Sequence, residues 1–269
     1  MERTGSVPMI HSVLKAIKIL NLFSVDKTRL SLNDVSTQLK IPNSTAHNLL
    51  NTLLSEGFIE KTGDGLYSLG KKPLVLTQTI RVNVEIRDPA APLLRELADQ
   101  TRESVYLTVR NGNYALYIYA IESPKRLLAR TAVGDQAPLH CTAVGKAMLA
   151  FLPAEELQTI IAKQRLQAFT KNTIVDKQAL ILELEKTRLR GFSIDNGEHE
   201  ENTYCIGAPI MNQKGEVIAA FSISGQDSSI ITEKIDDLAR EVTFYAQEIS
   251  RRMGFVPLRT THIALHADS

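Results

Sequence analysis

The sequence predicts an α+β fold with two domains, and three observations support this prediction. A chain of 269 residues is long enough for two domains. Up to about residue 70, short amphipathic helical patterns are followed by one hairpin pattern. The rest of the chain combines strand-like runs joined by turns with longer helices, as expected for an antiparallel sheet that is covered by helices.

The first two helices are predicted from apolar spacing and capping residues. Over residues 10–23, side chains at helical spacing form one apolar stripe: Ile10, Val13, Leu14, Ile17 and Leu20. A second helix is predicted over residues 32–40, because Ser31 and Asp34 resemble a capping box with Asp in place of Glu. Pro42 cannot continue this helix, which predicts a tight turn before the next one.

The third predicted helix runs from Asn43, as its cap, to about Glu56, and it has two contrasting faces. One face is apolar and must contact a core: Ala46, Leu49, Leu50, Leu53 and Leu54. The other face carries small hydrogen-bonding side chains, which are suited to reading base edges in a major groove. From this face we predict five DNA-contacting residues: Ser44, Thr45, His47, Asn48 and Asn51.

A hairpin is predicted after Gly57, with strands over residues 58–61 and 66–69 joined by Thr-Gly-Asp-Gly. The helices and this hairpin outline a winged helix-turn-helix over residues 1–70, with Lys61 as a further DNA contact. The third helix has no Lys or Arg, so one copy should bind DNA weakly, which favours a dimer or a larger assembly. A protein-docking module without DNA is the alternative.

The remaining elements follow from periodicity and turn residues. Residues 71–87 are predicted to form a linker helix, residues 88–256 a second domain, and residues 257–269 a C-terminal tail. In the second domain, Asp88 should cap the first helix. The predicted helices cover about 89–101, 143–152, a segment from 153 onward, 176–190 and 231–253. The predicted strands cover 104–109, 114–121, 126–133, 192–195, 204–211 and 217–224.

Composition excludes several classes of protein. The net charge is +1 with 23% charged residues, as in an ordinary soluble protein. We expect no signal peptide and no membrane segment, since no apolar run approaches the ~20 residues that span a bilayer. The two cysteines, Cys141 and Cys205, give neither a disulfide framework nor a zinc-finger spacing. A cytoplasmic location is therefore expected.

Three segments of the second domain have the residue types of a binding site. Residues 138–147 form a strand-to-helix corner, where free amides at a helix N-terminus attract carboxylates. Residues 191–209 combine an acidic residue with Cys205. On the third segment, Ser222 and Ser224 point to the same face of an otherwise apolar strand. These hydroxyls need partners, and a polar ligand is one possibility.

Taken together, these motifs resemble the IclR family of bacterial transcriptional regulators. The resemblance rests on the winged helix, LHCTAVGKAMLA, GFSID followed by CIGAPI, and FSISG, and it extends from about Ile10 to Met253. It implies a linker helix and a C-terminal GAF-like domain that binds a small effector. It also implies dimers, often paired into homotetramers, on palindromic operator DNA, with no enzymatic activity and no cofactor.

The resemblance also implies an effector site for a small organic acid. Its residues are Ala143, Val144, Asp195, Cys205, Ser222 and Ser224. The amides of Ala143 and Val144 would hold an anionic group, and the Ser and Cys side chains would bind the remaining polar atoms. Asp195 would repel a carboxylate, so it should select a second substituent with a hydroxyl or amine proton. Size selection is assigned to three apolar neighbours: Leu128, Ala129 and Leu139.

The chain departs from the family pattern at Asn48, where many members have Arg, and at Asn196 and Asn202. With Asn48, a phosphate or guanine contact of that Arg is lost, and the other two changes concern loop geometry. For Gly145, two interpretations have equal weight: close packing of the helix and contact with a ligand. Residues 198–201 are interpreted as a solvated loop.

Three other functions are weighed as alternatives. One is a thiol enzyme that uses Cys205, His199 and Asp195. The second is a zinc site drawn from four residues: His140, Cys141, His199 and Cys205. The third is a regulator with a non-carboxylate effector.

Overall fold

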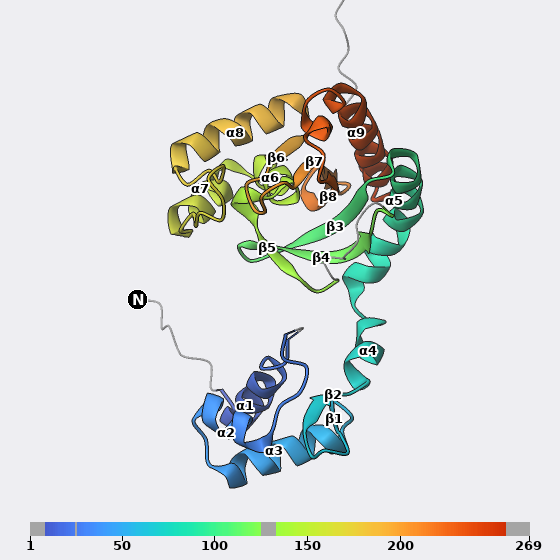
Figure 1. Ribbon diagram of the computed structural model, residues 1–269. Helices are drawn as coiled ribbons and strands as arrows, with labels where there is room; N and C mark the ends of the chain where they lie inside the picture. The colour runs from blue at the N-terminus through green and yellow to red at the C-terminus, as the bar shows by residue number, and fades with distance from the viewer. Residues whose placement is uncertain (1–8, 25, 125–132, 257–269) are drawn as a thin grey trace, which may run out of the picture. The chain divides into compact units, whose positions relative to one another are not determined.

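The computed structural model describes residues 9–24, 26–124 and 133–256, and the chain divides into two compact units (Figure 1). Unit 1 is Met1–Arg81 and unit 2 is Val82–Ser269. The predicted strand over residues 126–133 lies outside the described residues except for Val133, which is in a turn. The predicted tail over residues 257–269 also lies outside them. Among the described residues, no helix is both long and apolar enough to cross a membrane.

Unit 1 has the predicted winged helix-turn-helix order. Its elements are α1 (His11–Leu20), α2 (Leu32–Leu39), α3 (Asn43–Ser55), β1 (Ile59–Lys61) and β2 (Tyr67–Leu69). The two strands pair antiparallel, and an isolated bridge from Leu30 to Tyr67 extends this small sheet. The core contains the apolar stripes of α2 and α3 together with the strands, including the buried side chains of Val35 and Leu50. The stripe predicted for α1 is wrong in part, because Ile10, Val13 and Ile17 are exposed and the helix packs through Ile19 and its neighbours Ala16 and Leu20 instead.

Helix capping in unit 1 is partly as predicted. The capping box is confirmed, since Ser31 Oγ accepts from the Asp34 amide and the Asp34 carboxylate accepts from the Ser31 amide. The prediction that Asn43 caps α3 is wrong, because α3 already begins at Asn43 and Pro42 occupies the cap position without a side-chain hydrogen bond. The fixed φ of Pro42 places the chain at this corner without an Asn cap.

The prediction of one continuous linker helix over residues 71–87 is wrong. α4 (Lys72–Thr77) ends in a turn, and helical backbone resumes at residue 81. A π-helix over Asn83–Arg87 then continues into α5 (Asp88–Thr101). The prediction that Asp88 caps this helix is therefore wrong, because the helix does not start there. Pro89 explains why the helix widens into a π-helix here: in a regular α-helix, the proline ring would collide with the carbonyl four residues earlier. The Asp88 carboxylate accepts from Arg87 Nε at 2.8 Å instead.

Unit 2 contains a six-stranded antiparallel sheet in the order β5-β4-β3-β8-β7-β6. The strands are β3 (Ser104–Asn111), β4 (Tyr114–Ile121), β5 (Gln136–Pro138), β6 (Ser193–Asn196), β7 (Tyr204–Met211) and β8 (Val217–Gly225). The sequence did not predict β5, whose three residues are too few for a recognisable pattern. The combination of this sheet with surrounding helices confirms the predicted α+β class.

Helices cover both faces of this sheet (Figure 1). On one face, α5 and α9 (Ile235–Arg252) pack on strand residues such as Leu107, Ile206 and Phe221. On the other face, α6 (Ala143–Ala150), α7 (Ala154–Lys163) and α8 (Lys177–Arg190) form a second core with residues such as Ala220. Successive residues of a strand therefore face two different cores, which places Ser222 and Ser224 on the α6 side.

Candidate functional site

The outer surface of α3 carries most of the predicted DNA contacts. Ser44, His47, Asn48 and Asn51 are exposed, whereas Thr45 is half-buried. Asn51 Nδ2 lies 3.2 Å from His47 Nδ1, so these two side chains form a polar pair one turn apart. The arrangement leaves hydrogen-bonding groups, without apolar side chains, on the face that is open to a partner.

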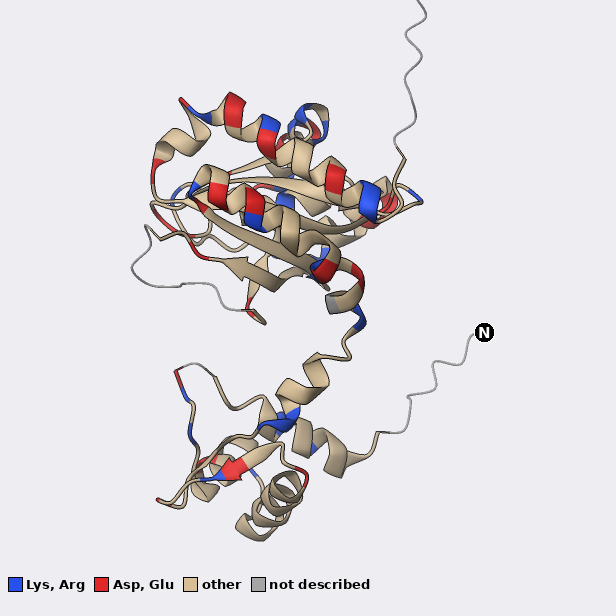
Figure 2. Cartoon of the chain, turned by 90° about the vertical axis from the view of Figure 1, so that its right-hand side faces the viewer, with Lys and Arg blue, Asp and Glu red and all other residues tan. Residues whose placement is uncertain are grey.

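Positive charge in unit 1 comes from outside α3, which has no Lys or Arg and has the colour of uncharged residues in Figure 2. Lys61 is exposed on β1, and its Nζ lies 5.6 Å from the centroid of the Tyr67 ring. Arg29 forms an ion pair with Asp64 in the hairpin turn at 3.4 Å. Phosphate contacts would therefore have to come from the hairpin and from neighbouring segments.

In unit 2, the strand register brings the predicted effector residues together. Asp195 is opposite Cys205 across β6 and β7, and Cys205 is opposite Ser224 across β7 and β8. These three residues thus form one row across the sheet. Ser222 lies in the next row on the same face, opposite Gly207 on β7 and Tyr106 on β3.

This face borders a cavity of about 220 Å³, which all six predicted effector residues line. They come from the start of α6 and from the three consecutive strands β6, β7 and β8, which follow α6 much later in the sequence. The cavity has nine further lining residues that the sequence did not single out for this site: Tyr106, Tyr117, Asp135, Gln136, Ala137, Thr142, His199, Glu200 and Thr203. Of the predicted apolar neighbours, Leu139 packs in the α6 core, and Leu128 and Ala129 lie outside the described residues.

The start of α6 is held at the cavity by Thr142. Its Oγ1 accepts from the Gly145 amide at 3.2 Å and donates to the Pro138 carbonyl at 2.9 Å. The amides of Ala143 and Val144 belong to the first turn, where no carbonyl of the helix can reach them. A Cβ on Gly145 would lie 2.2 Å from the Leu139 carbonyl oxygen, which favours the close-packing interpretation of this glycine.

Asp195 is a buried acid on the cavity wall. Its Oδ1 accepts from the Glu198 amide at 2.7 Å. Burial raises the pKa of this carboxyl to about 7, and the nearby charge of Glu198 adds to the increase. The backbone hydrogen bond and the charge of Lys146 oppose it. Asp195 is therefore able to change protonation near neutral pH, and a ligand that donates a hydrogen bond would favour its ionised form.

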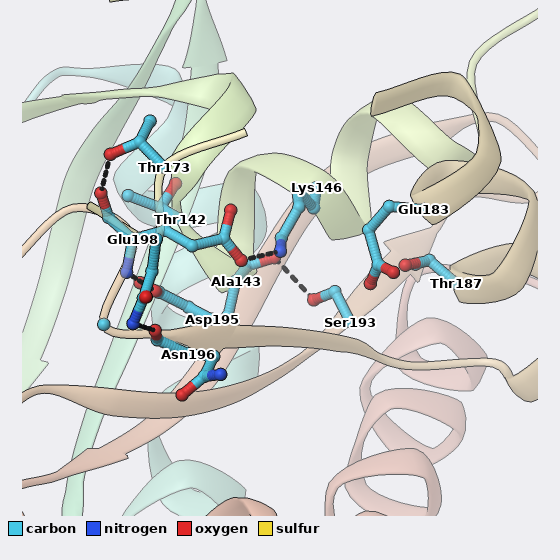
Figure 3. Close-up of polar contacts among 12 residues, drawn as sticks. Thr142, Ala143, Lys146, Thr173, Glu183, Thr187, Ser193, Asp195, Asn196 and Glu198 are labelled. Carbon is cyan, nitrogen blue, oxygen red and sulfur yellow. Dashed lines mark hydrogen bonds and ion pairs between the residues drawn. The ribbon is translucent and has the colours of Figure 1, made fainter. Parts of the chain in front are cut away.

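The interpretation of residues 198–201 as a solvated loop is wrong for Glu198. This side chain is buried and forms an ion pair with Lys146 of α6, whose side chain is 1% exposed (Figure 3). Burial raises the pKa of Glu198, and Lys146 opposes that increase. The sequence held one signal for this pair, because Lys146 is the single charge in an otherwise apolar helix and a buried charge needs a partner.

The residues of the zinc and thiol alternatives have other partners. His140 Nε2 lies 3.0 Å from the Gln167 carbonyl oxygen, and burial lowers the pKa of this imidazole. Burial raises the pKa of Cys141, so this thiol stays protonated at neutral pH. Cys205 Sγ donates to Ser224 Oγ at 3.2 Å. In the part of the chain that the structure describes, no three His, Cys, Asp or Glu side chains are grouped to hold a metal ion.

A winged helix-turn-helix followed by a sheet unit with a polar cavity defines a class of DNA-binding regulator. The IclR helix-turn-helix domain matches residues 12–63, and the C-terminal domain of the bacterial transcriptional regulator IclR matches residues 78–251. The chain belongs to the IclR family, and it is a DNA-binding transcriptional regulator.

Relatives match this chain over most of its length. The HTH-type transcriptional regulator KipR of Bacillus subtilis is 32% identical over 244 residues, which cover 91% of this chain and 97% of KipR. The HTH-type transcriptional regulator XynR of Escherichia coli is 31% identical over 250 residues, which cover 93% of this chain and 99% of XynR. The acetate operon repressor of Salmonella typhimurium is 27% identical over 248 residues, which cover 91% of this chain and 90% of the repressor.

Solved structures share the fold. The IclR of Thermotoga maritima aligns with a TM-score of 0.75 and 29% identity, over 92% of this chain and 100% of that one. An IclR homolog from Microbacterium hydrocarbonoxydans, complexed with 4-hydroxybenzoate, aligns with a TM-score of 0.81 and 23% identity. That alignment covers 90% of this chain and 98% of the homolog.

Proposed function

We propose that this regulator changes its affinity for operator DNA when a small organic acid binds in the cavity between α6, β7 and β8. One observation supports the proposal above all others. Six residues that were selected from separate sequence motifs line a single cavity of about 220 Å³. A cavity of this size suits a small molecule with a few polar groups.

The effector carboxylate would bind at the start of α6. The amides of Ala143 and Val144 face no acceptor within the helix, and the helix dipole favours an anion there. Ser222 and Ser224 would hydrogen-bond the remaining polar atoms from β8. Asp195 would accept a hydrogen bond from a second substituent, such as a hydroxyl or an amine, through Oδ2, since Oδ1 already accepts from the Glu198 amide.

A relative of the same fold provides a chemical example. The homolog from Microbacterium hydrocarbonoxydans is complexed with 4-hydroxybenzoate. This compound has a carboxylate at one end and a hydroxyl at the other, which are the two kinds of group that the α6 amides and Asp195 would bind. The compound is therefore a reasonable member of a test panel for this protein, alongside small aliphatic acids.

On DNA, we propose that a homodimer, or a homotetramer built from two dimers, places two α3 helices in successive major grooves about 34 Å apart. Ser44, Thr45, His47, Asn48 and Asn51 would contact bases or phosphates, and Lys61 would contact phosphate. The effector would bind one arrangement of the protein more tightly than another and so shift the balance between them. This shift would change the affinity for operator DNA by roughly 5–150-fold. Such a regulator would act in the cytoplasm, where bacterial operators are located.

A non-carboxylate effector is the second candidate, and the cavity lining favours it in one respect. Three carboxylates, those of Asp135, Asp195 and Glu200, line the cavity, and none of its described lining residues is Lys or Arg. Such a lining also suits a neutral or cationic ligand with several hydrogen-bond donors. Catalysis by Cys205 has less support, because this residue is buried and is paired with β6 on one side and with β8 on the other.

The test is fluorescence anisotropy of the full chain on the DNA upstream of its own gene, compared with scrambled DNA at one salt concentration. The panel contains small carboxylic acids, their amides and the matching alcohols. The proposal expects specific binding that an acid changes and its amide does not. A response to the amide or alcohol instead would favour the second candidate, and specific binding without any response would contradict effector control by this panel.

Two variants separate the proposed sites. Ser222→Ala should weaken the response to the acid and leave operator affinity without effector unchanged. Asn48→Ala should weaken operator binding and leave acid binding, measured by calorimetry, unchanged. An equal loss of both activities in either variant would mean that the substitution damages folding, and it would give no support to the assigned roles.

A further inference from the structure

Glu198 connects three parts of unit 2 with its backbone and its side chain (Figure 3). Its amide donates to Asp195 Oδ1 at 2.7 Å. Its carbonyl oxygen accepts from Thr173 Oγ1 at 2.5 Å, in the segment before α8. Its carboxylate forms the ion pair with Lys146 Nζ on α6. The position of the cavity acid Asp195 is thus tied, through one residue, to a helix far away in sequence.

Lys146 lies three residues after Ala143, which is about one turn of α6. The Lys146–Glu198 ion pair therefore joins the helix that presents the proposed anion-binding amides to the residue that holds Asp195. A second contact supports the same junction, because Ser193 Oγ of β6 donates to the Ala143 carbonyl at 2.6 Å. The α6 amides and Asp195 are consequently parts of one hydrogen-bonded assembly.

The ion pair is poorly explained as a source of stability. Both side chains are almost fully buried, and removing two charges from water costs free energy that their attraction does not reliably recover. In addition, Glu198 Oε2 is buried without a hydrogen-bond partner among the described residues. Apolar residues of similar volume often replace a buried ion pair with little loss of stability. A role in positioning other groups explains why charges occur there.

We propose that the Lys146–Glu198 ion pair is the positioning device of the cavity: it fixes the Asp195 carboxylate relative to the first amides of α6. This inference rests on the proposed binding of an effector in the cavity. With Oδ1 held by the Glu198 amide, Oδ2 is the oxygen available to a ligand. The ion pair then determines which second group an acid can carry when its carboxylate is bound at α6.

The first test needs no ligand. The double variant Lys146→Met/Glu198→Leu removes both charges with little change of volume and keeps the Glu198 backbone amide. Hydrogen exchange of that amide in the full-length protein reports its bond to Asp195. We expect exchange to be at least about tenfold faster in the variant, while amides of the β3–β8 ladder keep their protection. Unchanged exchange at residue 198 would overturn the positioning role.

A matched control makes the same chemical change elsewhere. Arg110 and Glu156 form an ion pair between β3 and α7, away from the cavity lining. Arg110→Met/Glu156→Leu should leave exchange at residue 198 as it is in the parent chain. If the control accelerated this exchange to the same extent, the effect would be a general loosening of unit 2, and the proposal would be wrong.

The second test uses calorimetry with 4-hydroxybenzoate and benzoate, which differ only in the hydroxyl group. The parent chain should prefer 4-hydroxybenzoate, and the Lys146→Met/Glu198→Leu variant should lose most of that preference while it still binds benzoate. An unchanged preference would contradict the inference. If the parent chain bound neither acid, that result would count against the proposed effector class, and hydrogen exchange would still decide the positioning role.

Discussion

Cys205 Sγ donates a hydrogen bond to Ser224 Oγ at 3.2 Å, and the two residues are register partners on β7 and β8. The Ser224 oxygen is therefore engaged as an acceptor within the sheet, and its own proton is available for a ligand in the cavity. A thiol in this row consequently orients a hydroxyl, which is a different role from that of a nucleophile.

The Cys205–Ser224 contact predicts unequal effects of two substitutions. Cys205→Ser keeps a donor of similar size, and acid binding should change by less than about threefold. Cys205→Ala leaves Ser224 free to rotate and should weaken acid binding by about fivefold, which corresponds to one ordinary hydrogen bond of ~1 kcal/mol. Calorimetry on both variants checks this order, and a greater loss with Ser than with Ala would contradict it.

The pKa of Asp195 predicts how stability depends on pH. The ordinary value is 3.8, and burial raises it to about 7 in the folded chain. Between these values the folded state holds a proton that the unfolded state has lost. This residue therefore makes stability fall as pH rises from about 4 to about 7, and its contribution is constant at higher pH.

Asp195→Asn removes this ionisation and should be more stable than the parent chain at about pH 8, by on the order of 3 kcal/mol, with a smaller difference at about pH 5. The Asn side-chain oxygen can still accept from the Glu198 amide. Urea denaturation of both proteins at the two pH values measures the difference. A gain that is equal at both values would show that the titrating group is another residue.

The buried ion pair predicts non-additive losses of stability. Lys146→Met alone leaves the Glu198 charge buried and unpaired, and should cost roughly 3–5 kcal/mol. Adding Glu198→Leu to this variant should restore most of the loss, because the second charge is then removed. Chemical denaturation of the two variants checks the prediction. A double variant that is no more stable than Lys146→Met alone would rule out this account of the pair.

Substitution by Ala should have a large effect on stability at Gly145 and almost none at Gly63. A Cβ at Gly145 would lie 2.2 Å from the Leu139 carbonyl oxygen, so Gly145→Ala must move backbone and should cost about 3 kcal/mol or more. At Gly63, nothing lies within 4 Å of the added Cβ, and Gly63→Ala should change stability by less than about 0.5 kcal/mol. Thermal unfolding of both variants provides the comparison.

Two substitutions on the DNA-binding surface should weaken DNA binding in different ways. Asn51 carries an amide that is suited to a base edge, so Asn51→Ala should cost about 1–3 kcal/mol and relax preference at one operator position. Lys61→Ala should weaken binding to all sequences alike and lower the salt dependence by about one phosphate contact. Binding isotherms on operator variants at several salt concentrations separate the two. Identical behaviour of both variants would contradict the assigned roles.

The sequence predicted the elements whose pattern is local. The capping box at Ser31 and the apolar stripe of α3 depend on residues three or four apart, and both are found as expected. β8 was predicted with its two inward hydroxyls, because alternation along a strand is also a local pattern. The π-helix at residues 83–87 was missed, since a proline after a helical run predicted a break in the helix.

The features that the sequence did not predict depend on long-range contacts. Lys146 and Glu198 are 52 residues apart, and nothing in their spacing indicates a pair. In the sequence, Glu198 stands in an acidic run, which is typical of a solvated loop. Tyr106 and Thr203 reach the cavity only because the strand order places β3, β8, β7 and β6 side by side.

The row formed by Asp195, Cys205 and Ser224 has a consequence for how such proteins diversify. Backbone ladders pair β6, β7 and β8, and the opposite face of β7 and β8 packs in the α5–α9 core. A slip by one residue would expose that core, so the register is strongly constrained. Single side-chain exchanges on the cavity face leave the ladder intact. New chemical preferences can therefore evolve by point mutation on an inherited backbone.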